Sequence, residues 1–225
     1  MKKIAVVINP ISGGGRGKKV WRVLQPGLHA LFDQMVYRMS NRLDDLESIT
    51  QSLLEENPDY LLVIGGDGTL NHALNGMIKG DHLRRQETKI AYFNAGCGGD
   101  FARQFPSQKI TEFLDRLIHN QCIQTNIGKM TRGNQPPHYF INIASCGLSG
   151  QVVLDTEKST WFKKLGGTIN YLAHSLTNVL TYSKSLVRIQ LDDNPAFECS
   201  LLMMAVCNGQ YFGGRMHVAP MAKMD

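Results

Sequence analysis

The segment from residue 60 to residue 78 constrains the fold most. Residues 60–64 form an unbroken apolar run, which is typical of a parallel strand buried on both faces. The run leads directly into Gly65-Gly66-Asp67-Gly68-Thr69, and apolar residues at helical spacing follow. A buried strand that turns through glycines into a helix indicates an open α/β sheet, in which ligands bind outside the carboxyl ends of the strands.

The same alternation runs through the first half of the chain. Residues 4–8 are a further apolar run that predicts a buried strand, and residues 89–93 are predicted as another strand. Helical spacing appears at residues 17–24, before Pro26, at residues 41–56 and around residues 110–119. Alternating strands and helices with short links predict a parallel α/β sheet, and we place this nucleotide-binding domain at residues 1–123.

The pattern changes after about residue 121. Four segments are predicted as strands, at residues 123–130, 138–144, 186–191 and 197–207, while residues 168–182 have helical spacing. The polar link at residues 192–195 is predicted to be a hairpin turn. We therefore expect a mainly β second domain at residues 124–225.

The Gly65–Thr69 string has the residue types of a phosphate site. Glycines let the backbone approach phosphate oxygens, and the first N–H groups of the next helix attract anions. We expect Thr69 to cap that helix. Asp67 requires a cation if phosphates lie beside it, and magnesium fits that role. The alternative is a plain strand-to-helix turn, which is also rich in Gly and Asp.

Two more glycine-rich loops follow predicted strands. The first is Asn9-Pro10-Ile11-Ser12-Gly13-Gly14-Gly15-Arg16-Gly17-Lys18, and the second spans residues 94–103. Ser12 and the neighbouring amides are predicted to reach phosphates, with charge from Arg16 or Lys18. No Gly-Lys-Ser/Thr closes the first loop, so it is not a Walker A loop. Taken alone, this first loop would fit a flexible surface loop. Together with the Asp67 loop, it indicates one shared polyphosphate site.

Composition narrows the class of protein. Five scattered cysteines without a C-x-x-C pair predict neither a disulfide framework nor a zinc site. No apolar run approaches the roughly 20 residues of a membrane-spanning helix, so we expect a cytoplasmic protein. The net charge of +5 suits anionic partners. Because no dense stripe of Lys and Arg is present, nucleic acid is not an expected partner.

Several motifs together resemble the family of diacylglycerol kinases, sphingosine kinases and bacterial lipid kinases. They are Asn9-Pro10 with Ser12-Gly13, the Gly65–Thr69 string, Asp100-Phe101-Ala102-Arg103, Asn142-Ile143-Ala144, Lys164-Leu165-Gly166 with Tyr171-Leu172, and Asn208-Gly209 through Ala219-Pro220-Met221-Ala222. The resemblance implies an α/β domain like those of NAD kinase and phosphofructokinase, packed with a β-sandwich domain. It also implies transfer of the γ-phosphate of ATP to a lipid hydroxyl, with a diacylglycerol-like substrate.

The same resemblance implies roles for individual residues. Asp67 would help to hold Mg²⁺, directly or through a water molecule, and would orient or deprotonate the lipid hydroxyl. Arg103 would either serve the site or pair with Asp100. The residues implied to line the nucleotide site are Asn9, Pro10, Ser12, Gly13, Gly14, Arg16, Gly65, Gly66, Asp67, Gly68, Thr69, Gly96 and Asp100.

The chain departs from the family pattern at three places. The family commonly has a Pro-x-Gly-Thr-x-Asn-Asp string where this chain has residues 94–100, so a hydroxyl and an amide, the latter at Gly99, are missing. A carboxylate usually found before the second domain is replaced by Asn126. The chain ends at Asp225, before further acidic motifs of the family, so we expect a truncated second domain that lacks its last strands.

Trp161-Phe162-Lys163-Lys164 places aromatic rings beside cations, a composition suited to a membrane surface. We therefore expect a lipid substrate met by peripheral membrane contact. The alternative is that the rings lie in the core of the second domain while the lysines face solvent. The sequence leaves a homodimer open.

Two other functions compete with the lipid kinase. NAD kinase shares the Asp67 string, and residues 94–99 satisfy its Asn-x-Gly-x-x-Gly pattern. A catalytically weak nucleotide-binding protein would explain Gly99 and Asn126. Residues 100–103 and the C-terminal motifs follow the lipid kinase pattern, so we favour the lipid kinase.

Overall fold

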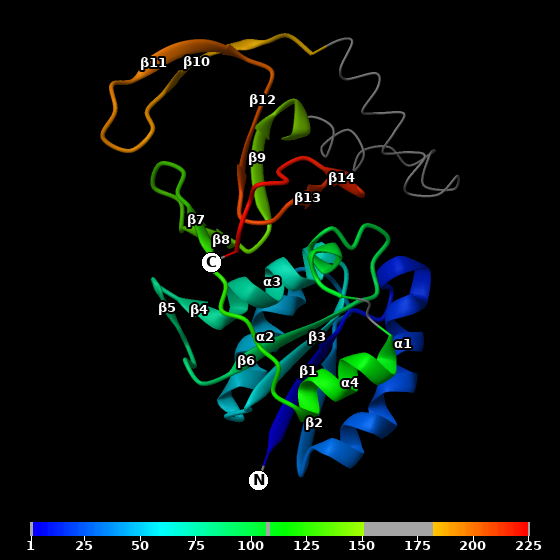
Figure 1. Cartoon of the computed structure of the whole chain (residues 1–225). Coiled ribbons are helices and arrows are strands. Elements are labelled where there is room, and N and C mark those ends of the chain that lie inside the picture. The colour runs from blue at the N-terminus through cyan, green and yellow to red at the C-terminus, as the bar shows by residue number, and fades with distance from the viewer. Residues whose placement is uncertain (1, 107–108, 151–181, 225) are drawn as a thin grey trace. The chain divides into compact units, whose positions relative to one another are not determined.

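The computed structural model describes residues 2–106, 109–150 and 182–224 (Figure 1). The chain forms two compact units, one of Met1–Asn142 with Asn208–Asp225 and the other of Ile143–Cys207. The C-terminal segment thus belongs with the N-terminal unit. The domain boundary between residues 123 and 124 stays a prediction from the sequence.

A four-stranded parallel sheet is the centre of the first unit. Its order is β2 (Gln34–Met39), β1 (Lys3–Ile8), β3 (Tyr60–Gly65) and β6 (Lys89–Asn94). The predicted strands at residues 4–8, 60–64 and 89–93 are confirmed. The sequence did not indicate β2, because this edge strand has no fully buried residue and so lacks an apolar run.

Helices cover both faces of this sheet (Figure 1). On one face α1 (Ser12–Leu31) and α4 (Ile110–Ile118) pack on alternate residues of the central strands; on the other face α2 (Asp45–Glu55) and α3 (Asp67–Met77) pack on the residues between them. The first core includes Ile4, Val6, Ile8, Leu62, Ile64, Trp21, Leu24 and Phe113, and the second includes Ala5, Val7, Leu61, Val63, Leu46, Leu54, Leu70 and Leu74. Burial on both faces explains why β1 and β3 are apolar throughout.

Helix α1 extends past Pro26, so the prediction that this helix ends before the proline is wrong. A proline inside a helix removes one backbone hydrogen bond. Trp21, Leu24 and Leu28 are buried on the same side of α1, and their packing holds the helix together across the missing bond.

The strand order places a topological switch point between β1 and β3. From β1 the chain crosses through α1 to β2 on one side, and from β2 it crosses through α2 to β3 on the other side of β1. The loops that follow β1 and β3 therefore leave the sheet in opposite directions and open a crevice at its carboxyl edge. These are the loops that contain Ser12 and Asp67.

The remaining elements are short. In the first unit, three antiparallel pairs join β4 (Ile78–Lys79) with β5 (His82–Leu83), β7 (Gly128–Met130) with β8 (His138–Phe140), and β13 (Tyr211–Phe212) with β14 (Met216–His217). A 3-10 helix, η1 (Phe101–Gln104), follows the third glycine-rich loop.

The described part of the second unit is mainly strand, with helical residues at positions 148–150. β9 (Ile143–Gly147) pairs with β12 (Met203–Cys207), and β10 (Ser185–Ile189) with β11 (Phe197–Leu201), both antiparallel. The predicted hairpin turn at residues 192–195 is confirmed by the β10–β11 pair. Residues 168–181 of the predicted helix lie outside the described residues. Of the helices that the structure describes, none combines the length and apolarity needed to cross a membrane.

Candidate nucleotide site

The loops after β1, β3 and β6 meet at the carboxyl edge of the sheet. The Asn9 backbone N–H donates to the Ile64 carbonyl at 2.9 Å, and the Ala95 N–H donates to the Gly65 carbonyl at 2.7 Å. These bonds continue the sheet ladder beyond the ends of the strands. The predicted convergence of three glycine-rich loops at one edge is therefore present in the structure.

Gly66 and Gly96 form the closest approach between two of these loops. A Cβ atom added at Gly96 would lie 2.5 Å from the Cα of Gly66, and one added at Gly66 would lie 3.2 Å from the Cα of Gly96. Real Cβ atoms do not approach other heavy atoms so closely as the first distance. Gly96 is thus needed so that the loops can pack on each other, whether or not a phosphate is bound, while a side chain at Gly66 would be tightly fitted.

Asn9 and Thr69 join the first two loops below the edge of the sheet. The Asn9 Nδ2 group donates to Thr69 Oγ1 at 3.1 Å, and both residues are buried. The prediction that Thr69 caps α3 is wrong, because the helix begins at Asp67 with Gly66 as a cap that makes no side-chain bond. Thr69 instead packs beneath Gly65, where its hydroxyl accepts the Asn9 bond.

Arg16 connects the first loop with the third. Its Nε group donates to the Ala95 carbonyl at 3.2 Å, and its Nη2 group donates to the Gly96 carbonyl. Before Arg16, Gly13, Gly14 and Gly15 have φ angles of +57°, +69° and +92°, a left-handed run that glycine adopts readily. At Gly14 and Gly15 an added Cβ would meet no atom within 4 Å, so a ligand has room to approach this stretch, although the Gly15 N–H already donates to the Ile11 carbonyl at 3.1 Å.

The Asp67 carboxylate binds the backbone of the third loop. Oδ2 accepts the Asp100 N–H and Oδ1 accepts the Phe101 N–H, both at 3.1 Å. Burial raises the pKa of Asp67 above its usual value, against the lowering effect of these N–H bonds. A carboxylate whose charge is disfavoured by burial gains from a nearby cation.

Asp100 binds the C-terminal segment. Its Oδ2 accepts the Gly214 N–H at 2.9 Å and its Oδ1 accepts the Arg215 N–H at 2.7 Å. Asp100 is buried. Arg103, which the sequence suggested as a partner of Asp100, forms no ion pair within the described part of the chain.

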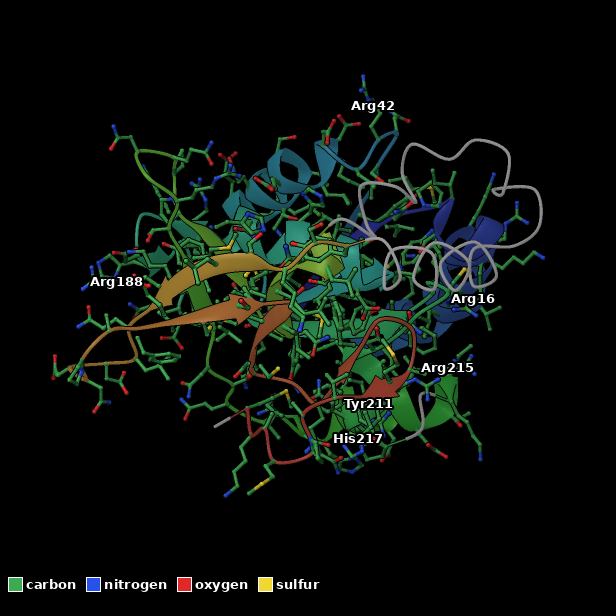
Figure 2. All side chains as sticks on the ribbon, turned by 90° about the horizontal axis from the view of Figure 1, so that it is seen from above. Arg16, Arg42, Arg188, Tyr211, Arg215 and His217 are labelled. Carbon is green, nitrogen blue, oxygen red and sulfur yellow. The ribbon has the colours of Figure 1, made fainter. Side chains whose placement is uncertain are left out.

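An open cavity of about 280 Å³ lies beside the third loop. Three arginines from distant parts of the sequence contribute to it, and Figure 2 shows that Arg16 and Arg215 lie on the same side of the first unit. No Asp or Glu is among its lining residues, which are Arg16, Asn94, Gly96, Cys97, Gly98, Gly99, Ala102, Arg103, Phe105, Pro106 and Arg215. Such a cationic lining suits a polyphosphate.

A larger hollow of about 500 Å³ lies on α4 and is lined by Thr111, Glu112, Asp115, Arg116 and Gln121. None of its lining residues belongs to the glycine-rich loops. Its two carboxylates would repel a phosphate. We therefore place the candidate site at the smaller cavity.

The predicted site residues occupy different places around that cavity. Arg16 and Gly96 line it. Asn9 and Thr69 are buried in contact with each other, and Asp67 and Asp100 are engaged by backbone amides beside it. The roles of Pro10, Ser12, Gly13, Gly65 and Gly68 in nucleotide binding stay predictions, and Trp161 through Lys164 lie outside the described residues.

The residues fit a magnesium ion only if the ion arrives with phosphates. No group of three or more His, Cys, Asp or Glu within the described residues could hold a metal. Each Asp67 oxygen accepts one N–H and keeps lone pairs for a further ligand. One carboxylate together with substrate phosphates and water is a common set of ligands for Mg²⁺, and the raised pKa of Asp67 favours such a partner.

Gly99 is one of the departures from the family pattern, and its surroundings explain why glycine fits at this position. Its φ is +66°, and a Cβ atom at this position would overlap the Asn94 carboxamide, whose Cγ would be 2.9 Å away. Asn94 is at the family's proline position, and its Oδ1 accepts the Gly96 N–H at 2.9 Å. The Asn94 side chain thus occupies the space beside residue 99.

Sequence reasoning missed an amide cluster that holds the C-terminal segment. Gln104 Oε1 accepts the Gln210 N–H at 3.1 Å, Asn142 Nδ2 donates to the Tyr211 carbonyl at 3.0 Å, and the Asn208 and Gly209 N–H groups donate to the Asn142 carbonyl, both at 2.9 Å. Asn142 belongs to one of the motifs that resemble the lipid kinase family, but no local pattern relates Asn142 or Gln104 to residues 208–211. A Cβ atom at Gly209 would lie 2.6 Å from Gln104 Nε2.

Asn126, the other internal departure, also contacts this segment through its backbone. Its N–H donates to the Met224 carbonyl at 2.7 Å, and its carbonyl accepts Asn208 Nδ2 at 2.8 Å. Together with the bonds of Asp100, these contacts tie residues 208–224 to the first unit.

A parallel α/β sheet with a cationic cavity at its carboxyl edge defines a nucleotide-binding protein of the phosphotransferase type. The chain belongs to the family of the diacylglycerol kinase catalytic domain, which residues 3–130 match. Residues 142–225 match the YegS C-terminal NAD kinase beta sandwich-like domain.

Relatives cover the whole of this chain. It is 27% identical to a diacylglycerol kinase of Staphylococcus epidermidis and 28% identical to one of Staphylococcus carnosus, and it spans 67% and 70% of their lengths. A solved structure of a diacylglycerol kinase from Bacillus anthracis superimposes with a TM-score of 0.70 at 24% identity, over all of this chain and 70% of that one. This likeness supports the two-domain fold.

Proposed function

We propose that the chain transfers the γ-phosphate of ATP to a hydroxyl group of a lipid, with a diacylglycerol-like lipid as the acceptor. The observation that carries the proposal is the cavity lined by three arginines and no carboxylate, beside the partly buried Asp67. Membership of the diacylglycerol kinase catalytic family supports a phosphoryl transfer from a nucleotide rather than simple anion binding.

The polyphosphate of ATP would lie between the first and third loops. Arg16 bridges these loops through the Ala95 and Gly96 carbonyls, and its guanidinium also borders the cavity. The space around Gly14 and Gly15 is free of other atoms, so a phosphate could approach this glycine-rich backbone closely. Positioning and charge neutralisation account for most of the rate of phosphoryl transfer.

Asp67 would act on the lipid hydroxyl. In the proposed step the hydroxyl oxygen forms a bond to the γ-phosphorus, the bond to the β-phosphate oxygen breaks to leave ADP, and the hydroxyl proton passes to the Asp67 carboxylate. A raised pKa makes this carboxylate a stronger base than an exposed one. Mg²⁺ bound by Asp67 and the phosphates would supply charge neutralisation.

Contact with a membrane is a second part of the proposal. The Trp161-Phe162-Lys163-Lys164 string has the composition of an interfacial segment. Co-sedimentation with vesicles that contain anionic lipid should fall in a Trp161→Ala and Phe162→Ala double variant. Equal co-sedimentation of variant and wild type would contradict this part. Pairing of two copies stays a prediction from the sequence.

The decisive experiment measures labelled γ-phosphate transferred from ATP into total lipid extract and into purified diacylglycerol. Arg16→Ala should lower the rate at subsaturating ATP by at least about 10-fold, since a charge-assisted bond to phosphate is lost. Arg22, an exposed arginine on the same helix, gives the matched control Arg22→Ala, which should behave as wild type.

Three outcomes would contradict the proposal in different ways. Label in NAD and none in lipid would make the chain an NAD kinase. Binding of ATP without any transfer would leave a nucleotide-binding protein. Equal rates in Arg16→Ala and Arg22→Ala would place the nucleotide outside this cavity.

A further inference from the structure

A strained turn in the C-terminal segment lies against the third loop. Gly213, Gly214 and Arg215 have φ angles of +65°, +80° and +94°. A left-handed φ is common for glycine but costly for arginine. Such strain persists only where the surroundings hold the backbone in place, and it is often found at functional sites.

Asp100 supplies the contacts that hold this turn. Its two carboxylate oxygens accept the consecutive N–H groups of Gly214 and Arg215 at 2.9 Å and 2.7 Å. Charge-assisted bonds of this length are stronger than neutral ones. Asp100 is only 8% exposed, so both acceptors are already committed to the backbone of the turn rather than directed at a ligand.

The held turn places Arg215 at the cavity. Arg215 lines the cavity together with Arg16 and Arg103, although the three residues come from the C-terminal segment, α1 and η1. The lining residues thus include three arginines and no Asp or Glu, a composition that favours an anion. Arginine binds phosphate in a bidentate manner.

We propose that Arg215 is a binding residue for the polyphosphate of a nucleoside triphosphate, and that Asp100 is the residue that positions it. This inference rests on the proposed function and adds a contact from the C-terminal segment to the nucleotide site. Asp100 then acts through Arg215 and does not itself contact the nucleotide or its metal ion.

Isothermal titration with ATP, AMP and inorganic tripolyphosphate tests the role of Arg215. Arg215→Gly removes the guanidinium and also relieves the left-handed strain, so the fold is kept. Affinity for ATP and for tripolyphosphate should fall by at least about 10-fold, a loss in line with one phosphate bond, while the melting temperature is unchanged or higher. The affinity for AMP should fall by less, because AMP has only one phosphate.

Arg42→Ala is the matched control for loss of one positive charge. Arg42 is exposed and lies just before α2 (Figure 2), where its only ion pair within the described residues is with Asp44 at 3.9 Å. ATP affinity of Arg42→Ala should equal that of wild type. An equal fall in both variants would mean that only the net charge matters, and would overturn the site.

A double-variant cycle tests the role of Asp100. Asp100→Asn cannot accept both N–H groups through carboxylate oxygens and should weaken ATP binding in the wild-type background. In the Arg215→Gly background the same change should alter ATP affinity by less than about 2-fold, because the residue that it positions is absent. Additive losses would mean that Asp100 acts directly on the ligand and would overturn its positioning role.

The titrations separate this inference from the proposed function. If wild type binds ATP and labels lipid while Arg215→Gly binds ATP equally well, the inference is wrong and the proposed function stands. If wild type binds neither ATP nor tripolyphosphate and labels no lipid, both are wrong.

Discussion

The carboxylate of Asp67 accepts the backbone N–H of Phe101 at 3.1 Å, across 34 residues of sequence. With the second bond, from the Asp100 N–H, the first residue of α3 holds the start of η1 in place. Asp67 therefore has a structural role in addition to the chemical role proposed for it. Each role can be tested by its own measurement.

Asp67→Ala should lower lipid phosphorylation by at least about 10²-fold, as is typical for loss of an acid–base group. The same change leaves two buried N–H groups without an acceptor, which costs about 1–3 kcal/mol for each group. Hydrogen exchange at Asp100 and Phe101 should therefore accelerate, as NMR or mass spectrometry can measure. Asp44→Ala, at an exposed carboxylate, is the control. Unchanged exchange in Asp67→Ala would show that these bonds do not order the loop.

The raised pKa of Asp67 predicts a stability change with pH in the absence of divalent cations. Between the usual carboxyl pKa, about 3.9, and the raised value, the folded chain binds the Asp67 proton more tightly than the unfolded chain does. The contribution of Asp67 to the free energy of unfolding therefore falls as the pH rises through this window. Urea unfolding with a chelator, at several pH values, measures it.

Asp67→Asn provides the reference for that experiment, because it has no titrating group at this position. The difference in the free energy of unfolding between wild type and Asp67→Asn should shift against wild type as the pH rises. Parallel curves for the two proteins would contradict the raised pKa.

Much of the architecture could be predicted from the sequence, because burial on both faces makes β1 and β3 apolar throughout. The convergence of the three loops then follows from the parallel sheet. Edge strand β2 was not predicted, since its residues are exposed or only partly buried. Helix α1 was predicted too short, because the packing of Trp21 and Leu28 outweighs the cost of Pro26.

The loops of the site could be predicted from the sequence, but the contacts that link these loops to distant residues could not. The glycines and Asp67 are adjacent in the sequence, so their motif could be recognised there. The contact between Asp100 and Arg215 spans 115 residues, and no local pattern relates the two. The same holds for the amide cluster of Gln104 and Asn142: Asn142 lies in a motif that resembles the family, but nothing in the local sequence relates it to Gln104.

Glycine can be required at this site for two reasons: close packing between two loops, or close approach of a phosphate. Gly96 and Gly68 allow these reasons to be tested separately. Gly96→Ala should destabilise the chain by about 1–3 kcal/mol, the usual cost of overpacking, because the added Cβ would lie 2.5 Å from the Gly66 Cα. At Gly68, in the first turn of α3, an added Cβ meets no atom within 4 Å. Gly68→Ala should stabilise by up to about 1 kcal/mol through helix propensity.

Thermal unfolding of the two alanine variants measures this contrast, and ATP titration adds a second comparison. If position 68 must be glycine so that a phosphate can approach the backbone closely, Gly68→Ala will bind ATP more weakly than wild type does, although the variant is more stable. Similar stability of Gly96→Ala and wild type would contradict the close packing of the second and third loops.

Gly99 and Asn94 should be energetically coupled. Gly99→Ala places a Cβ against the Asn94 carboxamide and puts alanine at a φ of +66°. The backbone cost is about 1–2 kcal/mol, and the overlap adds about 1–3 kcal/mol. In an Asn94→Ala background the overlap disappears while the backbone cost remains, so Gly99→Ala should be less destabilising there by at least about 1 kcal/mol. Chemical denaturation of the four proteins of this cycle gives the coupling energy. Strictly additive losses would show that the Asn94 side chain does not determine why this chain has glycine at position 99.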